Sequence, residues 1–330
     1  VHQTGCSITP DGLAYTYLQR CLTNLARHPN IGGVVFISLG CEVMQLEGCQ
    51  EAGGDLPLRL AQQMAPCAPV LSIQELGGID ATLQAGIRAV EELLAKVNTA
   101  RRSRQPVAGL KIALQCGGSD GWSGVTANPL LAMVVDERVS RDGTAVLSET
   151  PEIYGAEQLL LGRVKSKAAA LKLMRQIRWW EEQARLLGFS LDNNPTPGNK
   201  AGGLTTIYEK SLGAVAKGGG RALSAVYDYA ELLDAAGLVF MDSPGNDPVS
   251  ITGQLAGGCN LVAFTTGRGS VFGSGLAPTV KIASNSALFT RMRGDMDFNA
   301  GALLEGQPVQ AARDELLELI LRSASGTRTC

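Results

Sequence analysis

Apolar residues along the chain fall into two patterns, short continuous runs and longer stretches with helical spacing. Continuous runs, which are typical of strands buried on both faces of a sheet, occur at residues 31–39, 69–74, 110–114, 144–148, 237–241, 261–264 and 280–282. Apolar residues recur at helical spacing in residues 11–27, 79–97, 130–135, 155–187, 204–211 and 311–323. Because strands and helices alternate, the pattern predicts a mostly parallel sheet with crossover helices.

Glycine-rich turns follow most of the predicted strands. The chain has 40 glycines and only 5% aromatic residues, which favours an α/β enzyme over a helical bundle. Residues 193–203 are too rich in proline and glycine for a regular element, so we expect a domain break near 188–200. The sequence therefore predicts an α/β fold with two subdomains, residues 1–190 and 191–330, and an active site between them.

Composition excludes several classes of protein. With 330 residues, 45% of them hydrophobic, the chain can bury a large core, and its net charge of −2 gives no basic surface for nucleic acid. No apolar run reaches the ~18 residues of a membrane span. The eight cysteines form no CxxC pair, so we expect reduced thiols in a cytoplasmic protein rather than a disulfide scaffold or a zinc ribbon. The opening VHQTGC, without a start methionine or signal peptide, suggests a fragment or a processed product.

Three cysteines follow apolar strands at a turn. Cys6 and Cys41 each follow a glycine, and Cys116 follows Gln115 and precedes two glycines. Because parallel strands end at one edge of a sheet, these thiols could converge although they lie far apart in the sequence. Thiolates suit iron–sulfur clusters and other soft metals, and three of them leave one iron position open for a substrate. The alternative is that the three are small residues at tight turns.

Histidines and lysines supply the candidate general bases. With only His2 and His28 in the chain, a Ser-His-Asp triad is hard to build. His28 lies at a helix end, so His2 is the better functional candidate. Lys200, Lys210 and Lys217 lie in or beside glycine-rich turns, where each could bind a carboxylate or act as a base. The alternative for each is an ordinary surface lysine.

Acidic and anion-binding groups also follow the strands. The acidic candidates at such positions are Glu42, Asp120, Glu149, Glu152, Glu157 and Asp242. Residues 265–269, TTGRG, combine hydroxyls, backbone amides and the Arg268 guanidinium, as in an anion-binding turn. The chain contains no GxxxxGK[ST], and no GxGxxG opens a clear βαβ unit, so nucleotide binding is weakly supported.

Several long motifs together resemble one family. They are HPNIGG, GLKIALQCGGSDGWSGVTANP, LSETPEIYGAEQLL, NNPTPGNKAGGLTTIYEKSLGAVAKGG and MDSPGNDPVSITGQLAGGCNLVAFTTGRG. They resemble the catalytic region of the altronate dehydratase/galactarate dehydratase family, which includes the large subunit of sulfolactate sulfo-lyase. The resemblance implies an iron-dependent lyase that removes water from an aldonate or aldarate and leaves a 2-keto-3-deoxy acid. It also implies a small N-terminal β-rich domain, missing here or on a separate chain.

The resemblance and the strand-end positions together suggest roles for individual residues. Iron, as a ferrous ion or an iron–sulfur cluster, would bind Cys6, Cys41 and Cys116. The base that removes the proton next to the carboxylate would be His2, Lys200, Lys210 or Lys217. The substrate would contact Ser119, Asp120, Asn128, Glu149 and Arg268. Alternatives are a sulfo-lyase that acts on sulfolactate and a non-catalytic sugar-acid-binding module. The expected partner is a small sugar acid, without nucleic acid or membrane, and a homo-oligomer is compatible with the sequence.

Overall fold

The computed structural model describes residues 8–10, 12–44 and 68–330 of the chain. The chain divides into two compact units, residues 1–105 and 106–330. Among the described residues, none of the helices combines the length and the apolar character that a membrane span requires.

In the part of the first unit that the structure describes, a small parallel sheet lies with two helices. Strand β1 (Phe36–Ser38) pairs with β2 (Val70–Ser72), and the helices are α1 (Leu13–Ala26) and α3 (Ile79–Val97). Tyr15 of α1 and Phe36 of β1 are buried in the same apolar cluster. Both helices match their predicted ranges closely, whereas both strands are shorter than predicted, because pairing extends over only three residues of each.

The second unit is built on a seven-stranded sheet in which every neighbouring pair is parallel. Its strands are β3 (Lys111–Cys116), β4 (Thr144–Leu147), β5 (Leu223–Tyr227), β6 (Gly237–Met241), β7 (Leu261–Thr266), β8 (Thr279–Ala283) and β9 (Phe298–Asn299). They lie in the order β5-β6-β4-β3-β7-β8-β9, with β3 at the centre. This arrangement confirms the predicted α/β class with parallel strands and crossover helices.

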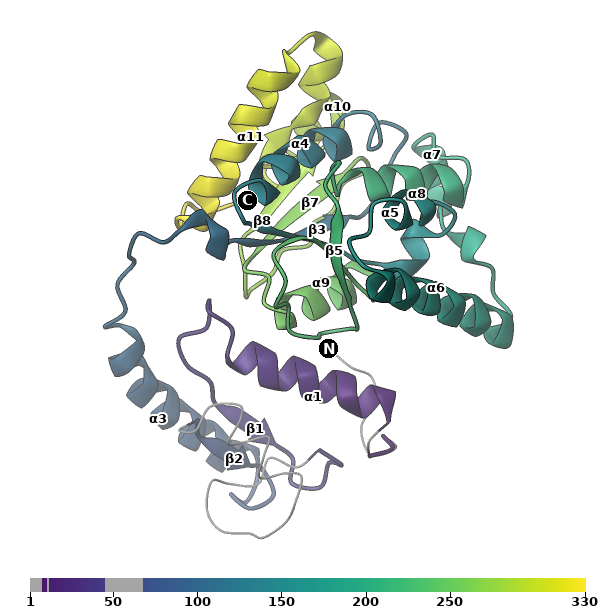
Figure 1. The fold of residues 1–330 in the computed structure, drawn as a ribbon. Coiled ribbons are helices and arrows are strands. Elements are labelled where there is room, and N and C mark those ends of the chain that lie inside the picture. The colour runs from purple at the N-terminus through teal and green to yellow at the C-terminus, as the bar shows by residue number, and fades with distance from the viewer. Residues whose placement is uncertain (1–7, 11, 45–67) are drawn as a thin grey trace. The chain divides into compact units, whose positions relative to one another are not determined.

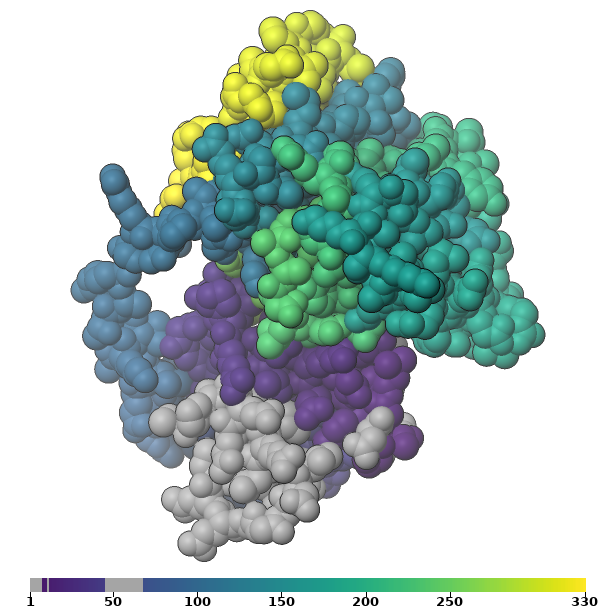
Figure 2. Space-filling model, viewed as in Figure 1, coloured from purple at the N-terminus to yellow at the C-terminus, as the bar shows by residue number. Residues whose placement is uncertain are grey.

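Helices cover both faces of this sheet (Figure 1). On one face, Ile112 and Leu114 of β3 belong to the main core together with α4 (Ala127–Val139), α6 (Lys167–Leu187) and α11 (Val309–Ala324). On the other face, α9 (Asp247–Ala256) packs against β3. In Figure 2, α11 and the segment around α6 occupy opposite ends of this unit. The central strand is therefore buried on both sides, as its continuous apolar run predicts.

Short helices fill the connections of the second unit. They are α5 (Gln158–Leu161), α7 (Pro197–Ala201), α8 (Ile207–Ala216) and α10 (Ser286–Arg291), with 3₁₀ turns at Val107–Gly109, Thr150–Ile153, Leu191–Asn193 and Ala300–Glu305. The predicted helix over 155–187 is divided into α5 and α6. The interruption arises because Lys165 N–H donates to the Leu223 carbonyl (2.9 Å), and Ser166 Oγ accepts from Ala169 N–H (3.1 Å) and so caps α6.

The boundary between the compact units differs from the expected break near residue 190. Strands β3 and β4 precede that position and β5 to β9 follow it, yet all seven share one sheet. Because their backbone hydrogen bonds join both halves, residues 106–330 form one unit, and the division lies at Gln105/Pro106.

Candidate active site

The carboxyl end of β3 lies where the sheet topology reverses. From β3 the chain moves to β4 on one side, and it later returns to β7 on the other side. Loops that follow such neighbouring strands diverge and leave a crevice that usually binds ligand. Here the Gly118 carbonyl accepts N–H groups from Gly267 (3.0 Å) and Arg268 (2.7 Å), and this contact fixes the β3 loop to the β7 loop. Gly118 adopts φ +61°, a conformation that favours glycine.

A polar cavity of about 320 Å³ opens at this edge of the sheet. Its charged and thiol groups come from Cys116 at the end of β3, from Glu149 and Glu152 after β4, from Lys210 in α8 and from Asp247 in the first turn of α9. Parallel strands thus bring together groups that are more than a hundred residues apart in the chain.

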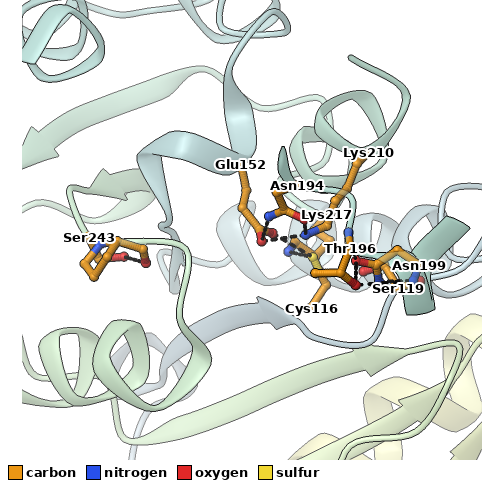
Figure 3. A network of polar contacts seen from close by, with 10 residues as sticks. Cys116, Ser119, Glu152, Asn194, Thr196, Asn199, Lys210, Lys217 and Ser243 are labelled. Atoms are coloured by element: carbon orange, nitrogen blue, oxygen red, sulfur yellow. Dashed lines mark hydrogen bonds and ion pairs between the residues drawn. The ribbon is translucent and has the colours of Figure 1, made fainter. Parts of the chain in front are cut away.

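Cys116 lies in contact with a lysine. Lys217 Nζ donates a hydrogen bond to Cys116 Sγ at 2.7 Å, and each residue is only 3% exposed (Figure 3). Sulfur is a ligand that suits soft metals. The contact with Lys217 therefore holds a candidate metal ligand in place at the cavity.

Lys210 forms a buried ion pair beside this sulfur. Its Nζ lies 2.6 Å from Glu152 Oε1 and 2.7 Å from Asn194 Oδ1, and Asn194 Nδ2 donates to the same Glu152 oxygen at 2.8 Å (Figure 3). Burial alone would lower the pKa of Lys210, but the Glu152 carboxylate raises it above its ordinary value. Burial alone would likewise raise the pKa of Glu152, but Lys210 holds it below its ordinary value. Both groups are therefore charged at neutral pH.

Two further carboxyl groups have raised pKa values. Burial, and then the Glu152 carboxylate, raise the pKa of Glu149 well above its ordinary value. The same two causes raise the pKa of Asp247 to about 6. The backbone of Glu149 is held in a left-handed conformation (φ 69°), and its N–H donates to Ser243 Oγ at 3.0 Å. Acid–base catalysis uses carboxyl groups that share one cavity and have pKa values displaced in opposite directions.

Two family models match the chain, one for each compact unit. The model of the C-terminal part of D-galactarate/altronate dehydratase matches residues 107–330, and that of the second domain of D-galactarate dehydratase/altronate hydrolase matches residues 1–98. The chain belongs to the D-galactarate/altronate dehydratase family. The gap between the two matches, residues 99–106, contains the boundary between the two compact units. The resemblance seen in the motifs is thereby confirmed.

Individual relatives carry the names of dehydratases. The chain is 37% identical to altronate dehydratase of Escherichia coli (strain K12) over all of its length and 64% of the relative, and 38% identical to altronate dehydratase of Bacillus subtilis (strain 168) over 92% of its length and 59% of the relative. It is 33% identical to galactarate dehydratase (L-threo-forming) of E. coli over 94% of its length and 59% of the relative. The chain thus spans about six tenths of the length of these relatives.

The structure places the predicted site residues in different surroundings. Cys116, Glu149 and Lys210 line the polar cavity, and Lys217 contacts Cys116. Ser119, Asp120 and Asn128 line a neighbouring cavity. Lys200 and Arg268 have exposed side chains and line neither of these two cavities. His2 and Cys6 lie outside the described residues, and Cys41 belongs to the first unit, where Gln74 Nε2 donates to its sulfur at 3.4 Å.

The side chains of Asp120 and Asn128 form hydrogen bonds with other groups of the protein. Asp120 Oδ1 accepts hydrogen bonds from the Ser123 and Ser284 hydroxyls at 2.8 Å each, and its Oδ2 accepts from Asn285 Nδ2 at 3.0 Å. Asn128 joins α4 to α8 and β7, because its Nδ2 donates to the Gly213 carbonyl (2.9 Å) and its Oδ1 accepts from the Thr265 hydroxyl (2.6 Å). In this structure both side chains hold the loops around the site in place.

Sequence reasoning gave no site role to Glu152, Asn194 or Asp247. Glu152 was an acidic candidate but was assigned no function, and Asn194 lies in the segment that was expected to separate two domains. Asp247 begins α9, shortly after the apolar strand β6, and this position after a buried strand was the signal that could have identified it.

Gly117 should not tolerate a side chain. A methyl group at this position would collide with the Asp247 carboxylate and lie 2.8 Å from Phe264 Cζ. We expect Gly117→Ala to lower the free energy of unfolding by about 1–3 kcal/mol, because overpacking forces the loop or Asp247 to move. Urea unfolding measures this effect. Gly109→Ala is the matched control, because nothing lies within 4 Å of its added methyl group, and equal losses in both variants would contradict the prediction.

Asp247 should make stability depend on pH. Its pKa rises from 3.8 to about 6 on folding, so between these values the folded state binds more protons than the unfolded state. The contribution of Asp247 to stability should therefore be largest below pH 4 and fall as the pH rises through 6, with a total loss of about 3 kcal/mol. Asp247→Asn cannot ionise and should remove this loss. Unfolding of both metal-free proteins from pH 4 to pH 8 tests the prediction, which parallel stability curves would contradict.

Proposed function

We propose that the chain carries the catalytic region of a lyase that dehydrates a sugar acid to a 2-keto-3-deoxy acid. The observation that carries the proposal is the pair Glu149 and Glu152, whose pKa values are displaced in opposite directions in one cavity beside Lys210 and Cys116. Dehydration needs a base, an acid and a cation for the carboxylate, and this cavity supplies all three. The names of the relatives support the same reaction class.

Lys210 is suited to bind the substrate carboxylate. An ammonium group has three N–H donors, and among the described residues the Lys210 ammonium is bonded to Glu152 and Asn194. One donor is therefore available to a ligand in the cavity that Lys210 lines. Because the raised pKa keeps Lys210 protonated, we assign it to binding rather than to proton abstraction.

Asp247 and Glu149 are suited to the two proton transfers. With a pKa of about 6, Asp247 is ionised at neutral pH and accepts the proton from the carbon next to the carboxylate. Glu149 keeps its own proton, because its pKa is raised, and donates it to the leaving hydroxyl group, which departs as water. The electron pair of the broken carbon–hydrogen bond forms a carbon–carbon double bond, and the carbon–oxygen bond of the leaving hydroxyl group breaks. The resulting enol tautomerises to the 2-keto acid. His2, Lys200 and Lys217 remain the alternative bases.

Iron remains part of the proposal, with Cys6, Cys41 and Cys116 as its ligands. Cys116 fits such a role, because its sulfur is stabilised by Lys217 and lines the cavity. Within the described part of the chain, no three histidine, cysteine or acidic side chains are grouped so that they could hold a metal. The contributions of Cys6 and Cys41 therefore rest on the sequence. Iron, when bound, would act as a Lewis acid on the charge that develops in the reaction.

A substrate screen tests the proposed reaction. The iron-loaded chain is incubated with aldonates, aldarates and sulfolactate, and 2-keto acid and sulfite are assayed. We expect 2-keto acid from at least one sugar acid. Release of sulfite instead would favour a sulfo-lyase, a reaction named for a relative from Chromohalobacter salexigens that is 31% identical over 77% of this chain and 67% of its own length. Binding of sugar acids without turnover would favour a non-catalytic module.

A further inference from the structure

A second cavity of about 250 Å³ adjoins the polar one. Cys116 and Lys210 line both cavities, so a ligand bound at Lys210 can extend from one into the other. The proposed proton-transfer groups, Glu149 and Asp247, line only the first cavity. The second cavity is therefore placed to receive a part of the substrate that does not react.

Ser119 offers this second cavity an unused hydroxyl group. The residue is only 4% exposed, and its Oγ has no hydrogen-bond partner among the described residues. Its position is fixed, because Asn199 Nδ2 donates to the Ser119 carbonyl at 2.8 Å (Figure 3). A buried hydroxyl without a partner is costly, and a hydroxyl group of a ligand would satisfy it.

The charges around the second cavity disfavour an anion. Two acidic residues, Asp120 and Glu209, line it, and Glu209 accepts hydrogen bonds from Thr205 N–H (2.8 Å) and Thr205 Oγ1 (2.6 Å). Lys210 is the single cation in the lining, and its ammonium faces Glu152 and the first cavity. Leu204 and Leu212 contribute apolar surface, against which the C–H groups of a carbon chain can pack.

We propose that the second cavity is the subsite for the distal end of the substrate, and that it selects a neutral hydroxyl end over a second carboxylate. On the basis of the proposed function, the preferred substrate class is then a six-carbon aldonate rather than an aldarate. Ser119 would hydrogen-bond a hydroxyl group of the distal carbons. Glu209 and Asp120 would repel the second carboxylate of a diacid.

Binding and turnover of altronate, galactarate and the four-carbon aldonate erythronate test this inference on the iron-loaded chain. Titration calorimetry gives Kd, and 2-keto acid formation gives kcat/KM. We expect altronate to bind at least tenfold more tightly than galactarate. Ser119→Ala should weaken altronate binding about fivefold to tenfold through the lost hydrogen bond, and leave erythronate unchanged because erythronate lacks the two distal carbons of altronate. Glu209→Gln should increase the relative affinity for galactarate several-fold.

Two variants serve as matched controls, Ser140→Ala and Glu305→Gln, which replace exposed residues that line neither cavity. Galactarate bound as tightly as altronate, or Ser119→Ala acting equally on altronate and erythronate, would overturn the inference. Selective binding of altronate without any keto acid would instead support the subsite and contradict the proposed dehydration. A wrong substrate preference and a wrong reaction therefore give different experimental results.

Discussion

Replacing Lys210 by methionine is expected to lower the free energy of unfolding by about 3–5 kcal/mol and to abolish turnover. The variant leaves the buried Glu152 carboxylate without its ammonium partner, which lies 2.6 Å away in the native protein. The charge must then stay uncompensated or bind a proton. Because Lys210 also lines the cavity at the carboxyl end of β3, the variant loses the cation that we assign to the substrate carboxylate. Urea unfolding and the keto-acid assay measure the two effects.

Two further variants separate stability from function. Adding Glu152→Gln to Lys210→Met removes the unpaired charge, so most of the lost stability should return while turnover stays absent. Lys172→Met is the matched control, because it breaks the more exposed ion pair of Lys172 with Glu231 (2.8 Å). That variant should cost only about 0–1 kcal/mol. A Lys210→Met protein as stable as Lys172→Met would refute the buried-pair interpretation.

Replacing Cys116 by serine is expected to remove bound iron and to reduce turnover to background, while the chain stays folded. A hydroxyl group is smaller than a thiol, so it fits the same site, and it can still accept the hydrogen bond of Lys217, which lies 2.7 Å from the sulfur. It is, however, a poor ligand for a soft metal. Anaerobic purification followed by iron and sulfide assays also separates a single ferrous ion from an iron–sulfur cluster. Circular dichroism verifies the fold.

Cys330→Ser is the matched control for this substitution. Cys330 is an exposed cysteine at the C-terminus, where its N–H donates to Asp297 Oδ1 at 2.8 Å. Its variant should keep both iron and turnover. Full iron content in Cys116→Ser would exclude Cys116 as a ligand, and loss of iron without loss of turnover would exclude iron from the reaction.

Local sequence patterns predicted the elements well where the spacing of apolar residues was regular. The range predicted for α3 is the observed one, Ile79–Val97, and the apolar run at 110–114 corresponds to β3. The predicted helix over 155–187 was wrong in its first third, because a strand-like contact with β5 interrupts it. That contact joins residues 165 and 223, which no local pattern connects.

The sequence by itself determined the family, the α/β class, the strand-end positions of Cys116 and Glu149, and the position of Lys217 beside a glycine-rich turn. These features follow from the alternation of apolar runs with glycine-rich turns, which is local information. Only the tertiary structure decided that Lys210 pairs with Glu152 and that Asp247 shares their cavity. It also decided that the segment near residue 194 supplies a site residue rather than a boundary. The physical reason is that strand order, and with it the proximity and desolvation of distant carboxyl groups, arises from sheet pairing across the whole of residues 106–330.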